Sequence, residues 1–242
     1  MVLQKMEICP KIVSLMCKEF LYPVSLSLNG RSCLIAGFGE VGKRKLAGLL
    51  AADVASVLVL DPYLQRHDQA DRRVTIEARE CTREDIKRSF MVFACTSSKT
   101  ENARLAALCQ ELNILCNDAT EPMQGSFIVP AIARKGGLTA TISTSGQSPA
   151  LARIWRMELE EWLEPRQKLA WLLGRLRKPL LEMGQTHICN RNFFRKAAAS
   201  PLGEWLQQNN LDACRQWLMA NLSVSLHAEL NQILKEYADV FA

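Results

Sequence analysis

Short apolar runs alternate with amphipathic stretches along the first half of the chain. The runs lie at residues 33–36, 57–60, 74–78, 91–95 and 114–116, and stretches with a helical period lie at 41–52 and 100–112. Thr82 followed by Asp85 three residues later predicts the start of a further, short helix. Regular alternation of strand and helix is typical of a parallel sheet with helices on both faces. We therefore predict an α/β fold built on a doubly wound parallel sheet.

The pattern changes beyond residue 118. Two β-rich runs at residues 126–133 and 138–143 follow each other without a helix between them, and residues 134–137 join them with two glycines. This arrangement predicts a β-hairpin. We also expect this β-rich segment to lack a covering helix of its own.

Helical patterns fill the remainder of the chain. Ser148 is a good N-cap and Pro149 a good first residue for a helix over residues 150–163. From Pro165 onward the pattern stays helical, with breaks at Gly184, Ser200-Pro201 and Asn209-Asn210. Three tryptophans in this part have the spacing of core positions: Trp171, Trp205 and Trp217. At the other end of the chain, residues 1–22 have the pattern of a leader helix or arm.

A glycine-rich turn separates the first predicted strand from the first predicted helix. Gly37, Gly39 and Gly42 have G-x-G-x-x-G spacing, with Glu40 and Val41 between the last two. Such glycines permit a tight turn, let the backbone approach a pyrophosphate and let the helix pack closely on the strand. The N-terminus of that helix then favours an anion. These five residues are candidates for binding a dinucleotide in a Rossmann-type domain, and an ordinary glycine turn is the alternative.

Polar residues follow three of the other predicted strands. Asp61 and Pro62 end the second apolar run, roughly 20 residues past the glycines, where an acid can accept hydrogen bonds from a ribose. An acid there repels a 2′-phosphate and favours NAD over NADP, although Asp61 also suits a turn. Thr96 and Ser97 follow the fourth run, and Asn117 follows the fifth. Because ligands of such sheets bind beyond the carboxyl ends of the strands, we expect these residues to border the cofactor.

Composition narrows the class of protein. With 242 residues, of which 48% are hydrophobic, the chain can bury a sizeable core. We find no apolar run long enough to span a membrane, and residues 1–20 carry charges throughout, so we expect a soluble, cytoplasmic protein without a signal peptide. The formal net charge of +5 comes from dispersed basic residues. This pattern argues against nucleic-acid binding. It suits a polycarboxylate ligand, and a solvated basic surface explains it equally well.

The nine cysteines fit neither a zinc site nor a disulfide scaffold by their spacing. Four of them lie in apolar surroundings, where a thiol acts as a small hydrophobe: Cys33, Cys95, Cys109 and Cys116. We predict that these four are reduced core residues and that the chain has no metal centre. Cys9 and Cys17, near the N-terminus, are candidates for reactive thiols.

Several segments, taken in order, match the pattern of one family. They are Gly37-x-Gly39-Glu40-Val41, Arg44-Lys45, Ala94-Cys95-Thr96, Asn102, Asn117, Ser126-Phe127-Ile128-x-Pro130-Ala131, and the block from Ile142 to Arg153 that contains Ser145-Gly146-Gln147-Ser148-Pro149. In order and spacing they resemble the sirohaem-synthase N-terminal family. Its members are precorrin-2 dehydrogenases, some of which also act as sirohydrochlorin ferrochelatases. The last block is the most specific part of the resemblance.

The resemblance implies that NAD⁺ accepts a hydride from precorrin-2 while a proton is lost, which yields sirohydrochlorin for sirohaem biosynthesis. It also implies that the substrate is bound by Ser126 and by five residues of the last block: Thr144, Ser145, Gly146, Ser148 and Arg153. Basic side chains would meet the acetate and propionate groups of this substrate. The candidates for that contact are Arg134, Lys135, Arg153 and Arg156.

The chain departs from the family at one position. The family usually has an Asp three residues after the Asn that ends the fifth strand, implicated as general base and in metal insertion, and here that residue is Thr120. A threonine takes no proton at neutral pH. We therefore predict Asp118 and Thr120 as the catalytic positions and assign general-base work to Asp118, with a turn cap as its alternative role. Glu121 is the other carboxylate beside Thr120.

The family is homodimeric, with the hairpin and the segment after it exchanging contacts between subunits; an intramolecular sheet extension is the alternative. The resemblance therefore implies three parts: an NAD-binding Rossmann domain at residues 22–125, a dimerisation segment at 126–163 and a helical C-terminal domain at 164–242. Two other functions stay open. One is a bifunctional dehydrogenase and ferrochelatase, and the other is a non-catalytic NAD-sensing module.

Overall fold

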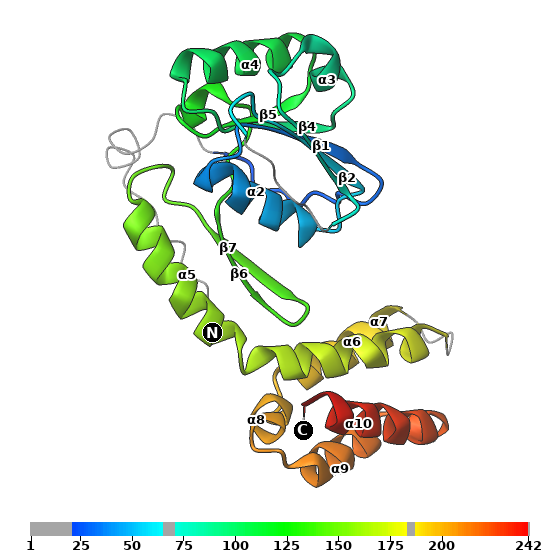
Figure 1. Cartoon of the computed structure of the whole chain (residues 1–242). Coiled ribbons are helices and arrows are strands. Elements are labelled where there is room, and N and C mark those ends of the chain that lie inside the picture. The colour runs from blue at the N-terminus through cyan, green and yellow to red at the C-terminus, as the bar shows by residue number, and fades with distance from the viewer. Residues whose placement is uncertain (1–20, 65–70, 183–186, 242) are drawn as a thin grey trace. The chain divides into compact units, whose positions relative to one another are not determined.

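A computed structural model of the chain describes residues 21–64, 71–182 and 187–241 (Figure 1). The chain divides into two compact units, the first ending at Val129 and the second beginning at Pro130. Cys9, Cys17, Gly184 and nearly all of the predicted leader lie outside the described residues. Within the described residues, no helix has the length and apolar character needed to cross a membrane.

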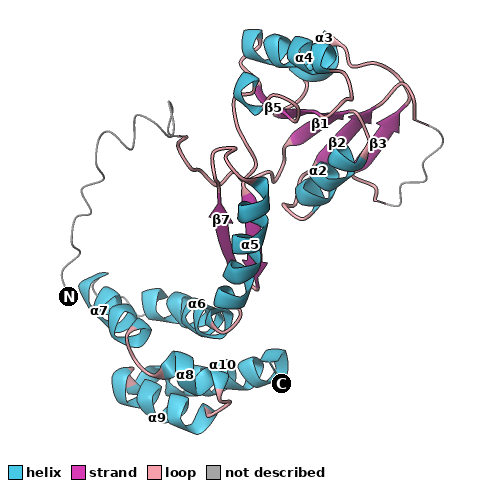
Figure 2. Cartoon of the chain, turned by 90° about the vertical axis from the view of Figure 1, so that its left-hand side faces the viewer, coloured by secondary structure: helices cyan, strands magenta, loops and turns pink. Residues whose placement is uncertain are grey.

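The first unit is a five-stranded parallel sheet with the strand order β3-β2-β1-β4-β5 (Figure 2). Its strands are β1 (Ser32–Ala36), β2 (Ser56–Leu60), β3 (Val74–Glu77), β4 (Met91–Ala94) and β5 (Leu115–Asp118). Its helices are α2 (Glu40–Leu50), α3 (Arg83–Lys87), α4 (Lys99–Glu111) and the 3₁₀ turn η1 (Pro122–Gln124). The predicted doubly wound fold is confirmed, and the strand order reverses between β1 and β4.

Helices cover both faces of this sheet, as the apolar strands require. Ile35 and Phe93 pack with α2 in one buried cluster. Their neighbours Leu34 and Val92 point to the opposite face and pack with α3 and α4 in another. Figure 1 shows α2 on one side of the sheet and α3 with α4 on the other. This two-sided burial explains why β1 and β4 are continuously apolar rather than alternating.

The four cysteines predicted to be core residues are buried and form no disulfide: Cys33, Cys95, Cys109 and Cys116. Burial raises the pKa of the Cys33 and Cys95 thiols to about 11. Both therefore stay protonated at neutral pH and act as small hydrophobic side chains.

The second unit begins with an antiparallel hairpin of β6 (Ala131–Lys135) and β7 (Leu138–Ile142). The predicted hairpin is present, but β6 starts five residues later than the predicted run. Ser126 instead donates its backbone N–H to the carbonyl of Cys116, which holds that segment against β5, and Pro130 has no N–H for a ladder. Arg134 and Lys135 belong to β6, so the turn is Gly136-Gly137 alone, with Gly136 at φ +52°.

Helix α5 (Pro149–Leu163) packs against both strands of the hairpin. The prediction that the β-rich segment lacks a covering helix is therefore wrong. Ser148 caps α5 by accepting the N–H of Leu151 at 3.3 Å, and Pro149 occupies the first turn, as predicted. The less exposed positions of α5 recur at helical spacing and include Ala152, Leu159 and the buried Leu163.

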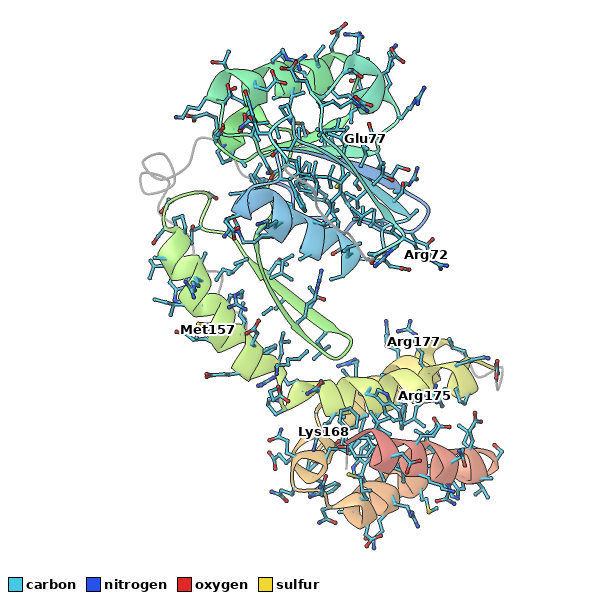
Figure 3. The ribbon with its side chains drawn as sticks, in the orientation of Figure 1. Arg72, Glu77, Met157, Lys168, Arg175 and Arg177 are labelled. Atoms are coloured by element: carbon cyan, nitrogen blue, oxygen red, sulfur yellow. The ribbon has the colours of Figure 1, made fainter. Side chains whose placement is uncertain are left out.

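Five helices and a 3₁₀ turn form the described remainder of the chain. They are α6 (Arg166–Glu182), α7 (His187–Ala198), α8 (Leu202–Gln207), α9 (Leu211–Asn221), η2 (Val224–Leu226) and α10 (His227–Phe241). Their shared core includes Leu172, Leu206 and Tyr237, and the three tryptophans predicted as core residues pack against it. Arg175 of α6 pairs with Glu236 of α10 on the surface (Figure 3).

Candidate dinucleotide site

The predicted cofactor residues of the first unit gather at the carboxyl edge of its sheet. Gly37 directly follows β1 and Asp61 directly follows β2, while Thr96 lies just past β4 and Asn117 lies in β5. The strand order reverses between β1 and β4. In open α/β sheets, the crevice at such a reversal is where ligands bind.

The glycine loop has the shape that a pyrophosphate requires. A Cβ on Gly37 would lie 2.5 Å from the carbonyl oxygen of Cys95, and one on Gly42 would lie 2.2 Å from that of Gly37. Apart from the glycine and its chain neighbours, no described residue has an atom within 4 Å of a Cβ built on Gly39. Gly39 is also the N-cap of α2, and no side chain caps the helix there. The first N–H groups of α2 thus lack a capping side chain among the described residues, and the open space at Gly39 leaves room for an anion near this helix end.

Asp61 is held by two backbone donors. Its Oδ2 accepts the N–H of Phe38 at 2.7 Å, and its Oδ1 accepts the N–H of Tyr63 at 3.0 Å. The second bond forms the turn through Pro62 that the sequence predicted as an alternative role. The first bond ties the carboxylate to the glycine loop, so the acid lies beside the predicted dinucleotide site. A carboxylate retains lone pairs for ribose hydroxyls when it accepts one bond at each oxygen.

A buried asparagine connects the ends of β4 and β5. Asn102 is fully buried in α4 and receives the N–H of Thr96 at 3.1 Å. Its own amide donates to the carbonyl of Thr96 at 3.1 Å and to Oγ1 of Thr120 at 3.3 Å. Thr96 is half-buried and Ser97 is exposed. Asn102 is one of the residues that carry the family resemblance, but no role was predicted for it. An asparagine in an otherwise apolar helix face is a signal of such a network.

Asp118 is buried and acts as a turn cap. It is 1% exposed, and its Oδ1 accepts the N–H and the hydroxyl of Thr120, each at 2.7 Å, and the N–H of Glu121 at 2.9 Å. Its Oδ2 has no hydrogen-bond partner among the described residues. Glu121 pairs with Lys99 at 2.9 Å. The cap role is confirmed, and general-base work by Asp118 stays a prediction.

Asn117 lies on the opposite face of the sheet from Asp118 and is 4% exposed. Its Nδ2 donates to the carbonyl of Phe127 at 3.1 Å, but its Oδ1 has no partner in the described part of the chain. A buried acceptor without a donor is uncommon in folded proteins. The amide oxygen is therefore a buried acceptor that no described residue satisfies.

The predicted substrate residues divide between the two units. Ser126 belongs to the first unit, where its Oγ accepts the N–H of Cys116 at 2.8 Å. The others belong to the second unit, where the turn before α5 places Ser145 at φ +50° and Gly146 at φ +80°. Thr144 accepts the N–H of Ser148 at 3.2 Å. This block is thus a compact turn that starts a helix.

The four basic candidates differ in their surroundings. Lys135 pairs with Glu164, and Arg156 pairs with Glu160. Arg134 and Arg153 are exposed, and neither pairs with a carboxylate among the described residues. Of the four candidates, only Arg134 and Arg153 therefore have a guanidinium free for a carboxylate ligand.

Comparison with known proteins adds three findings. Residues 24–131 match a family model described as "Putative NAD(P)-binding". The chain is 32% identical over 201 residues to "Siroheme synthase 2" of Aeromonas hydrophila subsp. hydrophila and 29% identical over 178 residues to "Siroheme synthase 2" of Yersinia enterocolitica. These matches cover 81% and 72% of this chain but 42% and 38% of the relatives. The chain thus spans about two fifths of the length of the curated relatives it matches.

A solved structure shares the fold. The structure titled "SirC, precorrin-2 dehydrogenase" matches with a TM-score of 0.60 at 20% sequence identity, covering 90% of this chain and 100% of that one. At this identity the match establishes the architecture: a parallel sheet with helices, a small antiparallel sheet and C-terminal helices.

Proposed function

The chain belongs to the family of the sirohaem-synthase N-terminal region, and on that premise we propose that it is an NAD-dependent precorrin-2 dehydrogenase. The observation that carries the proposal is the glycine loop, where the open space at Gly39 adjoins the uncapped N-terminus of α2. The names of its relatives and of the SirC structure support the choice of substrate. The reaction would convert precorrin-2 and NAD⁺ to sirohydrochlorin, NADH and a proton.

The residues at the carboxyl edge of the sheet support one orientation of NAD, with the adenosine beyond β2 and the nicotinamide beyond β4 and β5. The N–H groups at the start of α2 would hold the pyrophosphate, and Asp61 beyond β2 would accept the adenosine ribose hydroxyls and disfavour a 2′-phosphate. The nicotinamide half then falls beyond β4 and β5, beside Thr96 and Asn117. The unpartnered Oδ1 of Asn117 supports this, because a nicotinamide carboxamide offers an N–H to such an acceptor. Bound there, NAD⁺ supplies the hydride acceptor.

Asp118 would take the proton that leaves the substrate. Its Oδ2 is a buried carboxylate oxygen without a hydrogen-bond partner among the described residues. Thr120 holds the other oxygen through two hydrogen bonds and so acts as a positioning residue. Arg134 and Arg153 would bind carboxylate arms of the macrocycle, since charge-assisted bonds of this kind are strong.

We also propose that the protein works as a homodimer through α5. Five large apolar side chains of α5 are 39% to 52% exposed: Leu151, Ile154, Trp155, Met157 and Trp162. Figure 3 labels Met157 on this helix. Apolar surface of this extent is typical of an interaction site. Trp155→Glu should shift the mass measured by light scattering from dimer to monomer, whereas Arg177→Glu on α6 should not.

The central experiment is incubation of the purified chain with precorrin-2 and NAD⁺. We expect NADH and sirohydrochlorin to appear together in equal amounts. The variant Gly39→Asp places a carboxylate in the open space of the loop, so it should abolish both products, while the exposed Gly48→Ala in the same helix should retain them. Absence of NADH with folded wild-type protein would refute the proposal.

The same assay separates the two alternatives. If the chain binds NAD, tetrapyrrole does not change that affinity and no NAD⁺ is consumed, the result would favour a sensing module. A spectral change with sirohydrochlorin that requires Fe²⁺ or Co²⁺, lost in Asp118→Ala, would favour a bifunctional enzyme.

A further inference from the structure

Lys45 differs from the other basic residues of α2 in its surroundings. Lys43 and Arg44 are exposed, and Lys43 pairs with Glu40 at 3.0 Å. Lys45 is half-buried, and its Nζ lies 5.5 Å from the centroid of the Phe93 ring. A helical side chain leans toward the N-terminus of its own helix. The ammonium of Lys45 therefore reaches toward the carboxyl edge of the sheet, where the dinucleotide site lies.

The charge of Lys45 has no anionic partner within the described residues. The titratable groups that act on it are the Cys95 thiol and the Arg44 guanidinium, and neither is an anion at neutral pH. Burial lowers the pKa of Lys45, because water is withdrawn from the ammonium and no carboxylate replaces it. The contact with the Phe93 ring offsets only part of that loss.

A second unpartnered group lies beside the same ring. Asn117 is the neighbour of Phe93 across the β4–β5 ladder, and side chains of paired residues share one face of a sheet. Its buried Oδ1 lacks a donor. Phe127 packs edge-on against Phe93, with 5.6 Å between the ring centroids. The ends of β4 and β5 thus present a cation and an acceptor that the described protein leaves unpaired.

We propose that Lys45 binds a carboxylate arm of the tetrapyrrole substrate. This inference rests on the proposed function, since it needs a polycarboxylate substrate next to the nicotinamide half of the cofactor. An acetate or propionate arm held by Lys45 brings the edge of its ring to the ends of β4 and β5. That is the position from which hydride transfer to a nicotinamide beside Asn117 takes place. Lys45 is thereby a substrate-binding residue that sets the position of the macrocycle.

Steady-state kinetics of Lys45→Met test the proposal. Methionine retains an unbranched apolar stem on Phe93 and removes the charge. We expect the KM for precorrin-2 to rise about tenfold, the effect of losing one charge-assisted hydrogen bond. The KM for NAD⁺ should stay unchanged. Lys43→Met, which removes the same charge from an exposed position two residues away, should change neither value.

An equilibrium measurement keeps this test separate from the proposed reaction. The probe is uroporphyrin, a stable tetrapyrrole with carboxylate arms, whose fluorescence changes on binding to the NAD⁺-loaded protein. Weaker binding by Lys45→Met than by Lys43→Met supports the assignment even if precorrin-2 is not turned over. Equal binding by both variants, or no binding by the wild type, overturns it. A rise in the KM for NAD⁺ alone also overturns it, because the ammonium would then serve the cofactor.

Discussion

Replacing Gly42 with alanine measures how closely α2 is seated on the glycine loop. The added Cβ would lie 2.2 Å from the carbonyl oxygen of Gly37 and 3.4 Å from Cγ2 of Ile35. Neither neighbour can move freely, because one is backbone and Ile35 is fully buried. The helix and the loop must separate by about 1 Å to restore an ordinary contact. Overpacking of this kind destabilises a protein by about 1–3 kcal/mol.

Gly48 in the same helix provides the matched control. No atom lies within 4 Å of a Cβ built there. Gly48→Ala should therefore gain the roughly 1 kcal/mol by which alanine is preferred over glycine in a helix. Gly42→Ala has the same gain in propensity, so the difference between the two variants isolates the contact. We expect that difference in unfolding free energy to be about 1–3 kcal/mol.

The assay can follow the two units separately, because all five tryptophans lie at position 155 or beyond. In urea unfolding, circular dichroism reports both units, whereas tryptophan fluorescence reports the second. We expect Gly42→Ala to lower the circular dichroism midpoint, leave the fluorescence midpoint unchanged and weaken NAD⁺ binding. If Gly42→Ala matched Gly48→Ala in stability and bound NAD⁺ like the wild type, the close-packing argument would be refuted.

Three further predictions follow from individual contacts. Asn102→Leu leaves half-buried partners unsatisfied at the ends of β4 and β5, so its unfolding free energy should fall by about 2 kcal/mol; an unchanged value would contradict this. Asp61→Asn removes the charge that repels a 2′-phosphate, so the ratio of KM for NADP⁺ to KM for NAD⁺ should fall about tenfold. An unchanged ratio would show that Asp61 lies away from the ribose. Arg79 holds the pKa of Asp85 below its usual range, chiefly through their hydrogen bonds. A depressed carboxyl pKa stabilises the fold above about pH 4, and this contribution is lost as the pH falls further. Arg79→Met should therefore lose less unfolding free energy than the wild type between about pH 5 and pH 3, and an equal loss would exclude the pair as the cause.

The parts of the fold that were predictable from sequence are those governed by local pattern. β1 and β4 are buried on both faces, which leaves an apolar run that few other environments produce. The cap of α3 was equally predictable, since Thr82 and Asp85 form the expected reciprocal bonds. The glycine loop was also predictable from sequence, because Gly37 and Gly42 stand where a Cβ would collide with nearby backbone.

Tertiary contacts decided the features that the sequence left open or placed wrongly. The β-rich run from Ser126 begins outside the hairpin because Cys116, ten residues away, takes its hydrogen bonds. The covering of the hairpin by α5 depends on how a helix folds back on preceding strands, which periodicity does not reveal. Lys45 is one of three consecutive basic residues, and only the packing on Phe93 distinguishes it.

The hydrogen bond between Asp61 and the backbone N–H of Phe38 links the predicted ribose site to the glycine loop. If NAD binds as proposed, one carboxylate both holds the glycine loop and contacts the ribose. On that proposal, cofactor preference and the conformation of the loop cannot be changed independently. A redesign toward NADP⁺ that simply exchanges Asp61 for a basic residue would also release the loop, and it would need a new acceptor for the Phe38 N–H.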